Sequence, residues 1–129
     1  MPMYQPEIET MPQDQIRAHQ SKLLVQQVRN VYDNVPYYRA KMEAKGITPD
    51  DIHGLEDLHK LPFLSKNDLR EAYPYGLLAR PLKDCVRIQS TSGTTGRRVV
   101  AFYTQHDIDL WEDCCARAIV AAGGTNEDV

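Results

Sequence analysis

Residues 85–104 read CVRIQSTSGTTGRRVVAFYT, and this stretch decides how the rest of the chain is interpreted. Its first part alternates apolar and polar side chains with a period of two, which predicts a strand over 85–90. Its last part, from Val99 to Tyr103, is β-branched and aromatic, and it predicts a second strand. The residues between them, 91–97, include two glycines. We therefore expect a β-hairpin with an open loop.

The loop of this hairpin combines groups that suit an anion. Glycines allow successive backbone N–H groups to converge on an anion, and hydroxyls and a guanidinium donate hydrogen bonds to phosphate oxygens. The pattern indicates a phosphate cradle, although a Ser/Thr/Gly-rich hairpin tip without a ligand has the same composition. It is not the P-loop of nucleoside triphosphatases, because two residues rather than four separate its glycines. The candidate ligands are Thr91, Ser92, Gly93, Thr94, Thr95, Gly96 and Arg97.

The residues before the hairpin predict helices. Apolar side chains recur at helical spacing from Ile16 to Val35, which favours an amphipathic helix from Pro12 to about Asn34. Shorter helices are expected at 37–45, 49–51 and 66–73. Ser65 would cap the last of them. The first eleven residues are polar and contain prolines, so we expect a loosely held arm.

A last helix is predicted after the hairpin. Thr104 is expected to cap it, with Asp107 completing a near capping box. Trp111 lies on its apolar face and is expected in the core. The predicted order is helices, hairpin, helix, which is an α+β arrangement.

Composition limits the classes of function. The 129 residues suit one domain, and a net charge of -3 argues against a nucleic-acid partner. Leu, Ile, Val and Phe make up roughly 22% of the residues, only just above the level at which chains tend to be disordered. We therefore expect a thin core.

Location is predicted from the cysteines and from the apolar runs. Cys85, Cys114 and Cys115 show no metal-ligand spacing, so reduced, buried thiols of a cytoplasmic protein are expected. No stretch approaches the ~18 apolar residues of a membrane helix, so no membrane partner is expected. The first residues lack the pattern of a secretory signal.

The order of residues in the loop is more specific than their composition. Ser-Gly-Thr-Thr-Gly and a basic residue, between two strands and before a helix, resemble the phosphate-binding loop of the adenylate-forming (acyl-CoA synthetase-like) enzymes. Four further segments resemble the N-terminal portion of the phenylacetate–CoA ligases: VPYYR at 35–39, LPFLSKNDLR at 61–70, YPYGL at 73–77 and DIDLW at 107–111. The resemblance covers nearly the whole chain from the first long helix onward.

This resemblance implies an α+β fragment of an α/β adenylate-forming fold. The parts would be a polar arm at 1–11, a helical subdomain at 12–84 and the start of a large nucleotide-binding domain at 85–129. It implies ATP-dependent conversion of an aryl carboxylate to acyl-AMP and then acyl-CoA, with ATP, Mg²⁺ and coenzyme A. The alternative is a non-catalytic phosphate- or nucleotide-binding module. A helical interaction protein with an idle hairpin is a third interpretation.

The resemblance also assigns residues. Residues 91–97 would hold the β- and γ-phosphates of ATP, and Lys66 is a possible second phosphate contact, although an exposed lysine without a role is the more common situation. The sequence departs from the family where Arg97 and Arg98 stand in place of the usual Lys-Pro. Arginine keeps the charge but presents a planar fork. Alone, this chain is expected to be incomplete and inactive, and to self-associate through exposed sheet edges.

Overall fold

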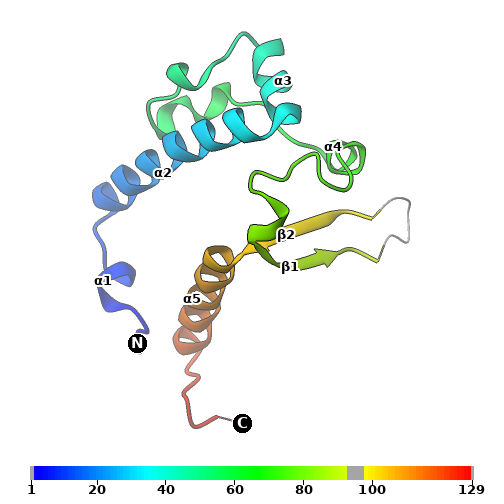
Figure 1. Cartoon of the computed structure of the whole chain (residues 1–129). Coiled ribbons are helices and arrows are strands. Elements are labelled where there is room, and N and C mark those ends of the chain that lie inside the picture. The colour runs from blue at the N-terminus through cyan, green and yellow to red at the C-terminus, as the bar shows by residue number, and fades with distance from the viewer. Residues whose placement is uncertain (1, 93–97, 129) are drawn as a thin grey trace.

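The computed structural model describes residues 2–92 and 98–128 (Figure 1). Helices occupy the first half, a two-stranded antiparallel sheet follows, and a helix is the last regular element, which confirms the α+β arrangement. The α-helices and strands are α1 (Pro6–Glu9), α2 (Gln13–Asn34), α3 (Pro36–Ala44), α4 (Lys66–Glu71), β1 (Cys85–Ser90), β2 (Val100–Thr104) and α5 (Gln105–Ala121). Three 3₁₀ turns, η1 (Pro49–Asp51), η2 (Leu55–Lys60) and η3 (Leu82–Asp84), connect them.

A single residue separates the two longest helices of the first half. Val35 has φ -120° and ψ 88°, and it ends α2 and precedes α3. The residue before a proline avoids the helical region, so Pro36 forces the break at Val35. Pro36 then starts α3, because its fixed φ suits a first helical position. The predicted break is therefore confirmed.

The core of the first half is small. Val28 of α2, Met42 of α3 and Ile52 after η1 form it, and Met42 and Ile52 are the fully buried large side chains among the described residues. Partly buried side chains surround them: Leu24, Tyr32, Tyr38, Ile47 and Leu61. The core is as thin as the composition predicts.

Side-chain caps start two helices at the predicted residues. The Ser65 hydroxyl accepts a hydrogen bond from the Asp68 N–H at the start of α4. Thr104 and Asp107 form the equivalent capping box of α5. Each cap satisfies N–H groups that a helix start leaves unpaired. The start of α5 is thus fixed directly after β2.

Several details differ from the sequence-based expectations. The arm contains the short helix α1, and α4 ends at Glu71 rather than near residue 73. Trp111 is 40% exposed and lies against the Tyr103 ring, so its assignment to the core was wrong. Cys114 and Cys115 are free but exposed rather than buried. Both errors arise because little of the described chain covers α5, where Ile108 near its start is buried but Leu110, Trp111 and Ile119 stay exposed.

The arrangement in Figure 1 places the hairpin and α5 to one side of the helices α2 and α3, and α4 lies between the two groups. The described helices include none with both the length and the apolar character to cross a bilayer.

Candidate functional site

The base of the hairpin loop is closed by paired hydrogen bonds. The Thr91 N–H donates to the Val99 carbonyl at 3.0 Å. The Val99 N–H donates to the Thr91 hydroxyl oxygen at 3.1 Å. The first bond joins the two backbones and the second joins the Val99 backbone to the Thr91 side chain, and together they hold the two ends of the loop next to each other. The predicted hairpin strands are therefore confirmed: they pair antiparallel, in regular register from Arg87 to Ser90 and with a register shift between Cys85 and Arg87.

The predicted phosphate ligands divide into two groups. Thr91 and Ser92 are described and exposed, whereas Gly93, Thr94, Thr95, Gly96 and Arg97 lie outside the described residues. The Thr91 hydroxyl uses an oxygen lone pair to accept from Val99 and keeps its proton to donate. Thr91 thus combines closure of the loop with a free donor group at its base.

A hollow of about 290 Å³ adjoins the loop at the ends of the strands. Its aromatic lining comes from the turn after α4 and from β2, where the rings of Tyr75 and Phe102 lie 5.6 Å apart at an angle of 38°. Its polar lining includes Ser90 and Arg98, which flank the loop on either side. The other lining residues are Tyr73, Ile88, Gln89 and Val100. The cation of Arg98 therefore stands beside the loop in addition to the predicted Arg97.

A larger cleft of about 840 Å³ separates α2 from the hairpin. Gln27 and Asn30 of α2 line one side, and the start of α5 lines the other with His106 and Asp107. Hydrogen bonds from the backbone and hydroxyl of Thr104 lower the pKa of Asp107. The carboxylate of Asp107 therefore stays ionised and occupied as a helix cap rather than free to act as a base.

Lys66 is the first residue of α4 and is exposed. In the part of the chain that the structure describes, no hydrogen bond or ion pair joins its side chain to the hairpin. Its role as a second phosphate contact stays a prediction.

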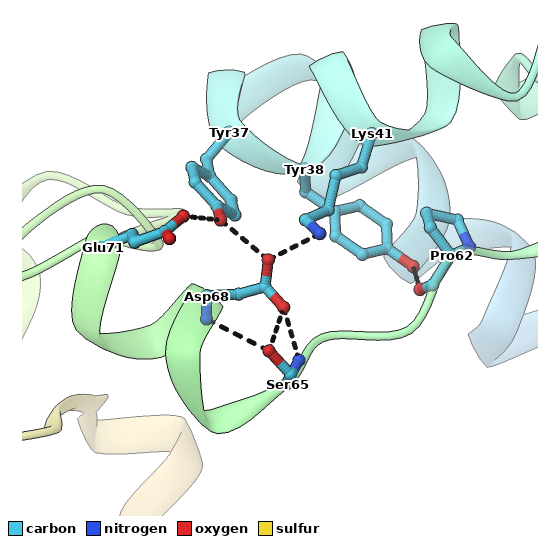
Figure 2. A network of polar contacts seen from close by, with 7 residues as sticks. All are labelled: Tyr37, Tyr38, Lys41, Pro62, Ser65, Asp68 and Glu71. Carbon is cyan, nitrogen blue, oxygen red and sulfur yellow. Dashed lines mark hydrogen bonds and ion pairs between the residues drawn. The ribbon is translucent and has the colours of Figure 1, made fainter.

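An unexpected polar cluster joins α3 to α4 (Figure 2). The Asp68 carboxylate accepts a hydrogen bond from the Tyr37 hydroxyl at 2.8 Å and pairs with the Lys41 ammonium at 2.5 Å. Its second oxygen accepts from the backbone N–H and the hydroxyl of Ser65, both at 2.6 Å. Glu71 offers the Tyr37 hydroxyl another acceptor at 3.2 Å.

The electrostatics of this cluster follow from its hydrogen bonds. The Lys41 ammonium, then the Ser65 donors, lower the pKa of Asp68, because each favours the ionised carboxylate. Hydrogen bonding to Asp68 raises the pKa of Tyr37, because the phenol donates to a carboxylate and loses that bond on ionisation. The sequence carried only a weak signal of the cluster: Tyr37 and Lys41 share one helix face at a spacing of four.

The described residues, 2–92 and 98–128, do not form a metal site of their own. They contain no group of three or more His, Cys, Asp or Glu side chains placed to hold an ion.

Comparison with known proteins shows what the whole chain is similar to. No family model matches the chain. Phenylacetate-coenzyme A ligase of Pseudomonas putida is 48% identical over 121 residues, a match that covers 94% of this chain and 28% of the ligase. The chain is homologous to phenylacetate–CoA ligases. Ligases of that name from Thermus thermophilus and Escherichia coli are 44% and 46% identical, and this chain spans 27% and 28% of them.

Solved structures of another CoA ligase share the fold. A 2-hydroxyisobutyryl-CoA ligase in complex with 2-HIB-AMP and CoA aligns with a TM-score of 0.78 and 30% identity, over 87% of this chain and 25% of that chain. The same ligase in its postadenylation state aligns with a TM-score of 0.80 and 27% identity, over 92% of this chain and 25% of its own. The resemblance to the N-terminal portion of a phenylacetate–CoA ligase is confirmed.

Proposed function

We propose that this chain supplies the ATP phosphate-binding loop of a phenylacetate–CoA ligase, with Thr91–Arg97 as the loop. The observation that carries the proposal is the closed hairpin base at Thr91 and Val99 in a chain that is 44–48% identical to such ligases. The composition of the loop alone is equally consistent with a hairpin tip that binds no ligand. The sequence similarity favours the ligase interpretation.

In this proposal the activity has two steps. A carboxylate oxygen of an aryl acid attacks the α-phosphorus of ATP, and the bond to the β-phosphate oxygen breaks, which gives acyl-AMP and pyrophosphate. The thiol of coenzyme A then takes the acyl group, loses its proton and releases AMP. The loop would act in the first step by holding the β- and γ-phosphates while negative charge develops on the leaving pyrophosphate.

Each part of the loop would contribute differently to that task. The hydroxyls of Thr91 and Ser92 would donate to phosphate oxygens, joined by Thr94 and Thr95 and by the backbone N–H groups of Gly93 and Gly96. Arg97 would neutralise charge, and Arg98 adds a second cation at the edge of the loop. Mg²⁺ would be bound chiefly by the phosphates and by water, since it usually keeps several waters.

Titration with pyrophosphate tests the loop directly. We expect calorimetric heat with the wild-type chain and a loss of about tenfold or more in affinity for Arg97→Ala, because a charge-assisted pair is removed. Arg29→Gln is the matched control, since it removes an arginine whose partner Asp50 is far from the loop in sequence and largely exposed. No heat with the wild-type chain, or equal affinity for Arg97→Ala, contradicts the proposal.

The activity of a whole ligase is a separate part of the proposal. The chain spans only 27–28% of the length of the relatives it matches. We expect this chain by itself to form no acyl-CoA from ATP, coenzyme A and phenylacetate. Measurable turnover with the purified chain overturns that expectation.

The non-catalytic binding module is the less favoured function. Its support was the loop alone, whereas three relatives that match 94% of the chain are CoA ligases by name. A cytoplasmic location stays a prediction.

Self-association through the hairpin is also proposed. Val86 and Ile88 of β1 are 57% and 59% exposed, and the apolar side chains of Leu110 and Ile119 on α5 are exposed as well. A two-stranded sheet leaves unpaired N–H and C=O groups at its outer edges, which invite pairing with another copy. Sedimentation at increasing concentration should show association in the wild-type chain and less in Ile88→Lys. A concentration-independent monomer contradicts it.

A further inference from the structure

We propose that Asp68 is a positioning residue: it ties α4 to α3 and thereby holds the hairpin that carries the phosphate-binding loop. The inference rests on the proposed function of that loop. A series of contacts connects α3 to α4, α4 to the turn that follows it, and that turn to β2. Each link is visible among the described residues.

The first link is the carboxylate of Asp68 itself. One oxygen receives the Tyr37 hydroxyl and the Lys41 ammonium, both from α3, and the other caps the N-terminus of α4 through Ser65 (Figure 2). The Asp68 side chain is 13% exposed and that of Lys41 is 33% exposed, so the ion pair between them is partly shielded from solvent. One residue therefore fixes where α4 starts and to which helix it is attached.

The second link is the turn that follows α4. The Gly76 N–H donates to the Ala72 carbonyl at 2.7 Å, and the Leu78 N–H donates to the Tyr75 carbonyl at 3.0 Å. A Cβ at Gly76 would lie 2.7 Å from the Ala72 carbonyl oxygen, so the chain approaches itself closely there. Such a short and tightly bonded turn transmits a displacement of α4 to Tyr75 instead of absorbing it.

The third link is the contact of the Tyr75 ring with Phe102. The two ring centroids are 5.6 Å apart, within the range of attractive aromatic pairs. Phe102 is paired with Ile88 across the hairpin. Three residues along the strand from Phe102, Val99 closes the loop with Thr91. At the rise of a strand that distance is about 10 Å, so the ring contact lies close to the loop.

A simpler role for Asp68 is a helix cap only, and the two roles differ in which variants affect the hairpin. Lys41→Met removes the ion pair to α3 and leaves the capping box of Ser65 and Asp68 intact. Ser65→Ala weakens the cap and leaves the ion pair intact. Tyr75→Leu removes the ring contact and leaves α4 untouched. Arg29→Gln, at a distant and exposed ion pair, is the control.

Hydrogen–deuterium exchange of the complete chain tests the proposal. We expect Lys41→Met to speed exchange about two- to fivefold in α4 and in β2, the range of a partly exposed ion pair. Ser65→Ala should speed exchange in α4 with little change in β2. Tyr75→Leu should speed exchange in β2 alone. The amides of α2 serve as the reference, and Lys41→Gln replaces Lys41→Met if those amides also change.

The outcomes separate this inference from the function of the loop. Unchanged exchange of β2 in both Lys41 variants overturns the positioning role. Faster exchange of β2 in Ser65→Ala, equal to that in Lys41→Met, also overturns it, because a cap alone would then explain the effect. Pyrophosphate binding is measured on the same samples. Its absence in the wild-type chain refutes the proposed function of the loop, while the exchange data still decide the role of Asp68.

Discussion

Truncation of Met42 examines whether the small core holds the first half of the chain together. Met42 of α3 is fully buried and packs with Val28 of α2 and Ile52 beyond η1. The Met42→Ala change removes most of a buried side chain and leaves a cavity between elements that have few other buried contacts. Truncations of this kind cost about 2–5 kcal/mol. A domain has roughly 5–15 kcal/mol of stability in total, so the loss is a large fraction of what this core supplies.

Urea denaturation followed by circular dichroism measures this loss. Met3→Ala is the matched control, because the same side chain is truncated at a site that is 44% exposed. A change at such a surface site is expected to stay within about 0.5 kcal/mol. Fluorescence of Trp111, the single tryptophan, follows the hairpin and α5 separately. A decrease below about 1 kcal/mol for Met42→Ala, or one equal to that for Met3→Ala, would refute the assignment of the core.

Three further predictions concern caps and titration. Thr104→Ala should lower the free energy of unfolding by about 1 kcal/mol, because α5 loses its side-chain cap; thermal melting beside Thr125→Ala, at the far end of the chain, checks it. The pKa values of Asp51, Asp57 and Asp107 are lowered mainly by hydrogen bonds to their ionised forms. Their stabilising effect is therefore complete above their ordinary pKa of about 4 and is lost as the pH falls below it; a urea midpoint that stays constant on acidification contradicts this. The pKa of Tyr37 is raised, so its hydrogen bond stabilises the fold below its ordinary pKa of about 10 and the stabilisation is lost at higher pH. Tyr37→Phe should therefore make the loss of stability at alkaline pH less steep. An unchanged dependence of the urea midpoint on alkaline pH would count against the bond to Asp68.

Local sequence signals predicted most of the helices and the hairpin. Val35 before Pro36 marked the end of α2, and Ser65 and Thr104 marked the starts of α4 and α5. These features depend on neighbours in sequence: a proline that excludes helical backbone at the preceding residue, or a hydroxyl within reach of the third N–H of its own helix. The loop motif and the other four segments also predicted the similarity to phenylacetate–CoA ligases, because their order is specific.

Contacts between distant segments lay beyond the reach of the sequence. Ser65 was expected to cap α4, but the pairing of Asp68 with Lys41 depends on how α3 and α4 are packed. Helix periodicity does not contain that information. The Tyr75 contact with Phe102 and the exposure of Trp111 have the same origin. An apolar stripe shows which face of a helix can be buried, but whether another element covers it is settled only in three dimensions.

The sequence by itself determined the elements and the similarity to phenylacetate–CoA ligases, because each is encoded by residues close together in the chain. Only the tertiary structure decided which polar side chains of α3 and α4 meet. Asp68 joins two helices whose contacting residues are 27 to 31 positions apart in the numbering, from Lys41 and Tyr37 respectively. Contacts between residues so far apart in the chain depend on the loops and the core that lie between the two helices. They contribute to stability only after those loops and that core have folded.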